Sequence, residues 1–402
     1  MRTPIRFPAV ALLLLSASTL IAGGFQLNEH GARAVGLGGA FAARASDPSA
    51  IYFNPAGLGF QTVNQISLGA TVILPRVAFF GPYQLNTNTK TAMDNQTFTP
   101  PHVYGTYHFS EDLHFGIGVY TPFGLGTQWP QEWSGKFITT KADLQSFFIS
   151  PTVAYRLRDG LSIGVGFNYA VGTVRLEQTV SDPFDPHGTL ALKFDANSFG
   201  FNVGVLYKPS SEISVGASYR SEVAFSATGT ADFTPNRPVY PEGDAKSSLT
   251  LPATGYLGVA YSLSDNLVVE ADYQYVGWSS YQELAVEFAG DGSKVISPKN
   301  YRDTFVLRVG AEYTMDDWQL RGGYFFDRTP VETPYVDPLL PDANRNGLNV
   351  GLGYRLTSSL SIDAAYMLLL MDERKAEKTV IDFDGTYQTR ADLFCVSLTY
   401  TF

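Results

Sequence analysis

The stretch GFQLNEHGARAVGLGGAFAARASDPSAIYFNPAGLG, residues 24–59, differs from the rest of the chain. It is rich in Gly and Ala and carries few charges. It shows neither a two-residue alternation nor an apolar run long enough to span a bilayer. Near its end, Asn54-Pro55-Ala56 is a turn signal. Because the chain that follows alternates as barrel strands do, we expect this stretch to plug the barrel, and we name residues 23–62 the hatch.

The composition suits a membrane barrel. Only 16% of the 402 residues are charged, against about 25% in ordinary globular proteins. Aromatic residues make up 14% of the chain, and the mean hydropathy is −0.03. After residue 22 no stretch offers the roughly 18 apolar residues that a spanning helix needs. These values are typical of a barrel with lipid outside and water or ligand inside.

The first 22 residues have the features of an export signal. Arg2 and Arg6 form a positive start, and Ala9 to Leu15 form a short apolar core. Small residues follow up to Ala22, after which we expect cleavage. The core is too short for a membrane anchor, so we predict a signal peptide over residues 1–22.

Charge and cysteine content exclude some partners. The formal net charge is −10, so the chain lacks the basic stripe that nucleic acid requires. The one cysteine, Cys395, excludes an internal disulfide, and we expect it to be a small buried side chain.

Metal sites have little support in the sequence. His102, His108 and His114 do not have the spacing of metal ligands. Residues 342–347, DANRNG, match the first half of a calcium loop, but Gly353 stands where the closing Glu belongs. A plain polar loop is the favoured interpretation, with surface calcium as the alternative. We expect no metal and no cofactor.

From residue 63 onward, large apolar residues alternate with small or polar ones. In the last strand, Phe394, Val396 and Leu398 share one face, with Cys395 and Ser397 on the other. This pattern predicts lipid outside and a lumen inside. We therefore predict an all-β fold, a transmembrane antiparallel barrel over residues 63–402. Its fourteen strands are expected near 64–80, 101–110, 113–127, 143–158, 160–178, 191–209, 212–231, 246–263, 266–288, 298–314, 317–328, 345–356, 359–374 and 388–402.

The connections support this count independently. Six short turns, the first at 110–112, alternate with seven long polar or Pro-rich connections, the first at 81–100. Short turns belong to the periplasmic side of an outer-membrane barrel and long loops to the outside. Both ends of an even-stranded barrel then lie in the periplasm, so the hatch enters the lumen from there.

Residues 120–126, YTPFGLG, place Pro122, Gly124 and Gly126 in the upper half of the third strand. Pro cannot donate to a strand ladder, and Gly inside a strand marks a bend. A kink here predicts a sideways opening in the wall. The alternative is that the strand ends near Tyr120 and a loop begins.

Two hatch motifs have competing interpretations. Gly36-Leu-Gly-Gly39 lacks the preceding strand and third glycine of a dinucleotide loop, so a close-packed backbone explains it better. Asn54-Pro55-Ala56 is either an exit turn into the first strand or a kink that gates the lumen.

Charged residues of both signs fall on lumen-facing positions. The structural interpretation is that these charged residues pair across the lumen or hold the hatch. The functional interpretation is that one arginine binds a ligand carboxylate. The candidate cations are Arg156, Arg220, Arg308 and Arg321.

The hatch resembles the plug of the FadL-type long-chain fatty acid transporters of Gram-negative outer membranes. The similarity lies in Gly24-Phe25-Gln26-Leu27-Asn28-Glu29, the Gly/Ala-rich middle and Asn54-Pro55-Ala56. Phe115 to Leu125 also resembles the third strand of that family. In layout the resemblance covers the whole mature chain.

The resemblance implies a mechanism. Extracellular loops would capture a hydrophobic ligand and pass it to a pocket beside the hatch. Movement of Gly24 to Asn28 would release it sideways through the kinked third strand into the outer leaflet. The implied hatch residues are Phe25, Leu27, Asn28, Asn54, Pro55 and Ala56, and the implied opening is formed by Pro122, Phe123, Gly124 and Gly126.

We therefore predict a non-enzymatic, passive transporter in the Gram-negative outer membrane, monomeric and in contact with outer-membrane lipid. Its predicted cargo is a hydrophobic small molecule, with long-chain fatty acids in first place. Thr173 stands where a carboxylate-binding cation is sought, so import of aromatic hydrocarbons is the alternative. A lipase-like enzyme is the alternative from another class.

Overall fold

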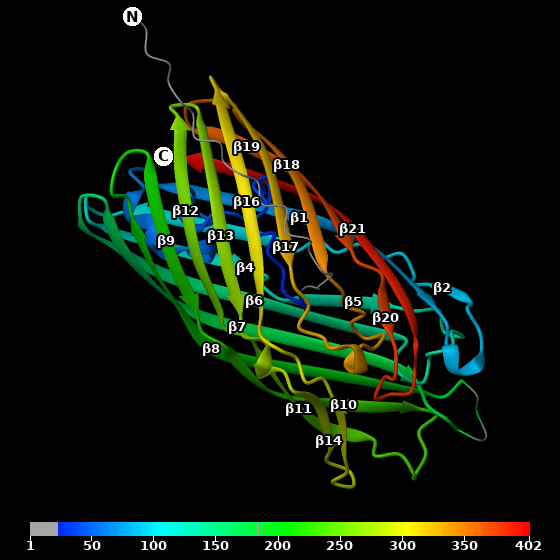
Figure 1. Cartoon of the computed structure of the whole chain (residues 1–402). Coiled ribbons are helices and arrows are strands. Elements are labelled where there is room, and N and C mark those ends of the chain that lie inside the picture. The colour runs from blue at the N-terminus through cyan, green and yellow to red at the C-terminus, as the bar shows by residue number, and fades with distance from the viewer. Residues whose placement is uncertain (1–22, 183–184, 186) are drawn as a thin grey trace, which may run out of the picture.

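The computed structural model describes residues 23–182, 185 and 187–402, whose strands close into one antiparallel barrel of fourteen wall strands (Figure 1). The predicted fold class and strand number are confirmed. The predicted signal peptide, residues 1–22, lies outside the described residues. In chain order the wall strands are β1 (Gln65–Phe80); β3 (Pro101–His108); β4 (Leu113–Tyr120) with β5 (Gly124–Gln128); β6 (Lys141–Arg158); β7 (Leu161–Thr179); β8 (Thr189–Tyr207); β9 (Ile213–Arg220) with β10 (Val223–Thr234); β11 (Gly243–Leu251) with β12 (Thr254–Ser264); β13 (Leu267–Val276) with β14 (Glu283–Phe288); β15 (Lys294–Pro298) with β16 (Thr304–Met315); β17 (Trp318–Asp327); β18 (Arg345–Arg355); β19 (Leu360–Met371) with β20 (Arg374–Ala376); and β21 (Gly385–Thr401).

The first and last strands close the wall. β1 and β21 pair in antiparallel register from Gln65 opposite Thr401 to Phe80 opposite Thr386. Short turns alternate with long connections around the barrel, which gives it a short-turn end and a long-loop end. The long connections carry the small elements β2 (Lys90–Ala92), η2 (Tyr83–Leu85) and η4 (Thr333–Tyr335).

Several wall strands that the sequence predicted as continuous are interrupted. The breaks fall at residues 121–123, 221–222, 252–253, 277–282, 299–303 and 372–373, and the fourth holds the short helix η3 (Trp278–Ser280). Pro252 and Pro298 lie at or beside two of these breaks, and a proline lacks the N–H that a central ladder needs. Beyond the breaks, β10, β11, β14 and β15 pair with one another as an extension towards the long-loop end.

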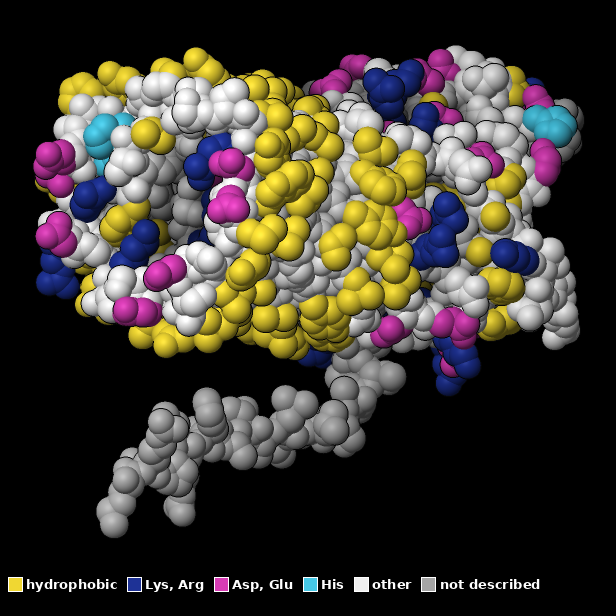
Figure 2. Space-filling model, turned by 90° about the horizontal axis from the view of Figure 1, so that it is seen from above, with side chains coloured by type: hydrophobic (Ala, Val, Ile, Leu, Met, Phe, Trp, Pro, Cys, Tyr) yellow, Lys and Arg dark blue, Asp and Glu magenta, His cyan; other side chains and the backbone are white. Residues whose placement is uncertain are grey.

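The outer face of the wall is apolar and the lumen face is mostly small or polar. In β21, Phe394 and Val396 are about half exposed, whereas Cys395 and Ser397 are buried. Figure 2 shows hydrophobic side chains as a broad band around the middle of the visible wall, with charged side chains towards both ends. Such an apolar band is typical of the lipid-facing surface of a membrane barrel.

The hatch lies inside the barrel and is mostly buried. It forms α1 (Ala32–Gly36), α2 (Ala50–Phe53) and the 3₁₀ helix η1 (Pro55–Phe60). Small residues allow this close approach: a β-carbon on Gly36 would come within 2.9 Å of the Gly351 Cα in β18. Gly38 and Gly39 have φ values of +68° and +75°, a region that favours glycine. None of the described helices is both long and apolar enough to cross a membrane.

Candidate functional site

The start of the hatch pairs with the break in the third wall strand. Gln26 forms an isolated antiparallel bridge with Phe123. The Leu27 N–H donates to the Pro122 carbonyl at 2.9 Å, and the Gly124 N–H donates to the Phe25 carbonyl at 3.0 Å. The hatch therefore supplies the backbone partners that this strand lacks at its break.

β4 and β5 both pair with β6. The third strand is therefore interrupted at residues 121–123 and does not end at Tyr120. Among the described residues, β5 has β6 as its only paired strand. On the other side, residues 97–100 bond to β1, for example Phe98 N–H to the Ile73 carbonyl at 3.0 Å. The wall ladder is therefore missing between residues 97–101 and 121–127.

This gap has definite limits. Towards the short-turn end it stops at the pair Val103 and Val119. Towards the long-loop end it stops at the bond from the Asp94 N–H to the Gln128 carbonyl, 2.8 Å long. Because Pro100, Pro101 and Pro122 carry no N–H, these positions cannot donate across the gap.

A cavity of about 390 Å³ runs through the gap. Its lumen side includes Leu27, Leu144 and Ala391, and its outer side includes Gln145 and the lipid-facing Phe147. The Phe98 ring covers Gly126 at the gap, where a β-carbon would overlap it. The cavity lining thus includes residues from the lumen side and from the outer side of the wall, and it is mainly apolar.

A second, smaller cavity of about 70 Å³ shares Phe25, Leu125 and Leu144 with the first. Phe25 is buried and its ring lies 4.7 Å from that of Trp278, edge to face. The lining also holds the ion pair Lys299–Asp337, which the sequence did not single out. The hatch residue Phe25 therefore separates the two cavities.

The hatch is anchored by carboxylates of β13. The N–H groups of Phe41 and Ala42 donate to Asp272, both at 2.9 Å. The N–H groups of Ala43 and Arg44 donate to Glu270 at 2.6 and 3.3 Å. Four consecutive backbone donors inside the lumen are satisfied in this way, which avoids the cost of burying them unpaired.

The predicted hatch residues take distinct positions. Asn54 donates to the carbonyls of Ala42 and Val205 at 2.8 and 3.1 Å and accepts from the Ala56 N–H at 3.2 Å. Pro55 opens η1. Asn54 is therefore a tie between the hatch and β8.

At the start of the hatch, Asn28 Oδ1 accepts long hydrogen bonds from Tyr52 and Tyr256, at 3.4 and 3.5 Å. Phe25 and Leu27 are the hatch residues that line the larger cavity with their side chains close to the gap. Phe123 is buried, with its ring 6.1 Å from that of Phe25. Three of the predicted residues therefore meet at the gap.

The four predicted arginines serve the hatch and its surroundings. Arg156 donates to the Gly59 carbonyl at 2.9 Å, Arg220 to the Tyr52 carbonyl at 2.8 Å, and Arg308 to the Gly38 carbonyl at 2.9 Å. Arg321 binds Glu312 and Asp363, each at 2.6 Å. None of the four lines either apolar cavity. This placement matches the interpretation that the lumen charges pair with one another or hold the hatch.

Two other residues hold the first turn of the hatch, a role that no sequence pattern predicted. Asp342 accepts from the Gly24 N–H at 2.9 Å and from Arg345 at 3.0 Å. Arg345 also donates to the Gly24 carbonyl. Asp342 had been noted only as the start of a possible calcium loop. Its buried carboxylate serves the hatch instead, and Arg345–Gly347 begin β18.

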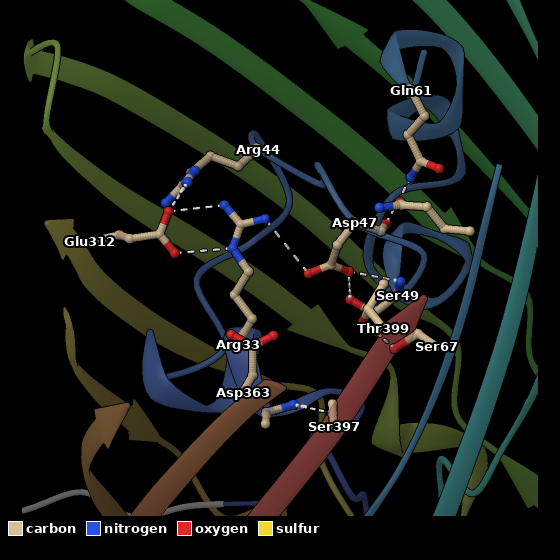
Figure 3. Close-up of polar contacts among 12 residues, drawn as sticks. Arg33, Arg44, Asp47, Ser49, Gln61, Ser67, Glu312, Asp363, Ser397 and Thr399 are labelled. Carbon is tan, nitrogen blue, oxygen red and sulfur yellow. Dashed lines mark hydrogen bonds and ion pairs between the residues drawn. The ribbon is translucent and has the colours of Figure 1, made fainter. Parts of the chain in front are cut away.

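The short-turn end of the lumen is polar. Figure 3 shows Glu312 between Arg33 and Arg44, which lie 2.9 and 2.5 Å from it. A cavity of about 330 Å³ beside this cluster is lined mainly by charged and hydroxyl side chains, including Asp47 and Asp363. The apolar cavities touch hatch residues within 24–27, whereas this polar cavity touches hatch residues within 31–49.

Burial changes the titration of two hatch side chains. Burial raises the pKa of the Glu29 carboxyl, although the Asn28 N–H bonded to it acts in the opposite sense. Burial also lowers the pKa of His30 well below its usual value, and nearby His102 and Arg220 add to that effect. His30 is therefore neutral while the hatch is docked.

A closed antiparallel barrel with a lipid-facing apolar belt, a hatch in its lumen and an apolar cavity at a gap in its wall defines a class, the plugged β-barrel membrane proteins. The comparisons give a narrower identity. The chain belongs to the family described as outer membrane protein transport protein (OMPP1/FadL/TodX), which matches residues 13–402. It is accordingly a protein of the Gram-negative outer membrane, so the long-loop end is extracellular.

Individual relatives agree with this assignment. A putative outer membrane protein of Neisseria meningitidis serogroup B is 26% identical over the whole of both chains. A long-chain fatty acid transport protein of Escherichia coli O6:H1 is 27% identical over 89% of this chain and 90% of its own. In fold, the chain is similar to a Pseudomonas aeruginosa FadL homologue, with a TM-score of 0.83, 22% identity, and 94% and 99% coverage. It is also similar to the P. putida toluene transporter TodX, with a TM-score of 0.75, 20% identity, and 94% and 99% coverage.

Proposed function

We propose that this protein imports hydrophobic small molecules passively and releases them sideways into the outer leaflet of the outer membrane. The observation that carries the proposal is the cavity of about 390 Å³ that passes through the wall between residues 97–101 and 121–127. Such a volume lies within the range of small-molecule sites. Apolar groups gain about 25 cal/mol per Å² on leaving water, so an apolar path needs no energy source.

The two ends of the lumen support a lateral exit. Towards the periplasm, the lumen is filled by the hatch and by the charged cluster around Glu312. An alkyl chain or aromatic ring gains nothing by entering that polar region. The gap instead faces the hydrocarbon core, where the ligand is most soluble.

In the proposed cycle, the extracellular loops capture the ligand, which then occupies the cavities beside Phe25. Displacement of the segment from Phe25 to Asn28 breaks its two backbone bonds to Pro122 and Gly124. Asn54, Pro55 and Ala56 hold the rest of the hatch in place. Pro122, Phe123, Gly124 and Gly126 then form the rim of the exit, and the barrel acts as a monomer.

Long-chain fatty acids and aromatic hydrocarbons both fit this mechanism. The names of the relatives cover both classes, since one is a long-chain fatty acid transport protein and another a toluene transporter. Hydrolysis is not proposed. Among the described residues neither apolar cavity is lined by a histidine, which a Ser–His nucleophile would require.

The direct test is to seal the wall. In the double variant Pro122→Val/Gly124→Val, the first change restores an N–H at the break and both changes introduce strand-forming side chains. We expect uptake of radiolabelled oleate and toluene by cells to fall at least tenfold, while the purified barrel still folds and still binds the ligand.

The matched control is Pro151→Val/Gly322→Val. Pro151 lies in β6 with an exposed side chain, and a β-carbon on Gly322 would meet nothing within 4 Å. This control should import normally. Normal uptake by the sealed variant would refute the lateral route and direct attention to a path past the hatch.

A further inference from the structure

The smaller cavity contains one buried cation, and that cation already has a partner. Lys299 follows β15 and Asp337 lies in the long connection between β17 and β18. Their exposed fractions are 3% and 6%, and the Lys299 ammonium is hydrogen-bonded to Asp337 Oδ2. Both residues line the cavity beside Phe25.

Asp337 cannot easily turn away from this pair. Its second oxygen, Oδ1, accepts the N–H groups of Leu339 and Leu340 at 2.9 and 3.4 Å. The Lys299 backbone is held too, since its N–H donates to the Gln282 carbonyl at 2.8 Å. The pair is therefore built into the loop structure.

Among the described residues, Lys299 is the one cation that lines this smaller cavity; Arg345, which lines the larger cavity, is already bonded to Asp342 and the Gly24 carbonyl. The lining near the pair is aromatic or aliphatic, with Tyr281 and Tyr301 edge to face at 5.0 Å. The remaining charged residue of the lining is Asp143, which stands in β6 opposite Arg175 and on the outward-facing register. A carboxylate placed beside Lys299 would therefore meet Asp337 and create an uncompensated buried charge, which is costly.

We propose that Asp337 occupies the place of a ligand carboxylate and that this cavity selects uncharged hydrophobic molecules. This inference rests on the proposed function and names its substrate class. An alcohol, an ester, a protonated acid or a hydrocarbon fits a net-neutral pair, whereas an ionised fatty acid does not.

The geometry also suits an uncharged oxygen at the end of the ligand. A lysine ammonium carries three N–H donors. Within the described residues, Asp337 is the one acceptor bonded to the Lys299 ammonium. The remaining donors can bind a hydroxyl or carbonyl oxygen, with the apolar chain directed past Phe25 into the larger cavity.

Calorimetry on the refolded full chain at pH 8 tests this with a matched ligand pair, 1-dodecanol and dodecanoate. We expect the unsubstituted protein to bind dodecanol at least tenfold more tightly. Asp337→Asn keeps an oxygen for Leu339 and Leu340 but removes the charge, so it should tighten dodecanoate binding at least tenfold. The control Asp232→Asn removes a carboxylate from the exposed pair with Lys193, 3.5 Å apart, and should change neither affinity.

A second variant protects the test against misfolding of the first. Lys299→Met/Asp337→Leu replaces the pair by apolar side chains, a change that buried ion pairs often tolerate. It should still bind dodecanol and should bind dodecanoate no better than the unsubstituted protein does. Equal binding of both ligands by the unsubstituted protein, or dodecanoate binding unchanged by Asp337→Asn, would overturn the inference and leave the transport proposal intact. Binding of neither ligand by the unsubstituted protein would overturn both.

Discussion

Gly24 is the residue on which the closed position of the hatch depends most directly. Its φ is +64°, a conformation that residues with a β-carbon rarely adopt. A β-carbon at this site would also overlap the Trp278 ring. Both of its backbone polar groups are bound, the N–H by Asp342 and the carbonyl by Arg345. The backbone conformation at position 24 therefore determines where the Phe25 side chain lies.

Gly24→Val is expected to displace the start of the hatch. The strained backbone and the clash together cost about 2–6 kcal/mol. Amide hydrogen exchange of residues 25–27 should therefore accelerate more than tenfold, while the thermal stability of the barrel changes little. The matched control is Gly292→Val, because Gly292 has a similar φ of +72° and nothing within 4 Å of its would-be β-carbon. Unchanged exchange in the Gly24 variant would show that another contact holds the segment.

At the scale of elements, the hatch is held to the barrel by polar contacts as well as by buried apolar side chains that pack against the wall. Its backbone donors bind Glu270 and Asp272, and its carbonyls bind Arg156, Arg220 and Arg308. These contacts are specific in geometry but modest in net energy, about 1 kcal/mol each for neutral pairs and more for charged ones. An element held in this way can move while the barrel stays folded.

The docked hatch should be less stable in mild acid because of His30. Its ring lies 3.8 Å from that of Tyr52 and 5.5 Å from that of Tyr120, and Nε2 lies 3.0 Å from the Leu27 carbonyl oxygen. Burial lowers the pKa of His30, and His102 and Arg220 further oppose its protonation. A released segment regains a pKa near 6.5 and takes up a proton, so lowering the pH below that value favours release.

Hydrogen exchange of residues 25–30 at pH 7.5 and 5.5 measures this effect, after correction for the intrinsic pH dependence of exchange. Each pH unit below 6.5 should favour release by up to about 1.4 kcal/mol. His30→Gln keeps a donor but cannot titrate, so it should remove the dependence. His187→Gln, at an exposed histidine, should leave it in place. A dependence that survives in His30→Gln would assign the switch to another group.

At the scale of the whole molecule, the lumen holds the hatch and the wall lacks part of one ladder. The hatch and the cluster around Glu312 lie in the lumen, and the missing ladder falls between residues 97–101 and 121–127. Ion flow and ligand flow should therefore depend on different parts of the structure. In the proposed function a polar solute would meet the hatch, whereas a hydrophobic ligand would leave by the gap.

Planar-bilayer recordings test this separation. The full chain should show little steady conductance, and deletion of residues 23–62 should produce a stable open pore with at least tenfold more current. Adding Pro122→Val/Gly124→Val to the deletion should leave that current unchanged, since ions cross by the lumen. A large steady current through the full chain would mean that the hatch does not seal the barrel.

Several site features could be anticipated from the sequence. Pro122, Gly124 and Gly126 stood out because proline and glycine break a ladder wherever they occur. The arginines at 156, 220, 308 and 321 stood out by lying on lumen-facing positions. Which interpretation held for them required contacts, since the hatch carbonyls that accept from three of them lie 97 to 270 residues away.

The sequence did not single out Lys299, Asp337, Asp342 or Arg345. Lys299 lies in a break within the tenth wall strand and Asp337 in a long connection, 38 residues apart, and no local pattern indicates their pairing. Asp342 binds the Gly24 N–H across 318 residues. The breaks in the seventh to tenth wall strands were also missed, because apolar alternation continues on both sides of each break.

By itself, the sequence determined the all-β class, the fourteen strands, the two faces of the wall and the alternation of short and long connections. These depend on local rules, since side chains in a strand alternate in direction whatever their partners are, and turn residues act where they stand. Only the tertiary structure decided how far the missing ladder extends, which hatch residues lie beside it and which cation lines the cavity. Those features depend on contacts between segments that are distant in the sequence, such as Phe25 with Phe123 and Lys299 with Asp337. A local sequence pattern cannot predict such contacts.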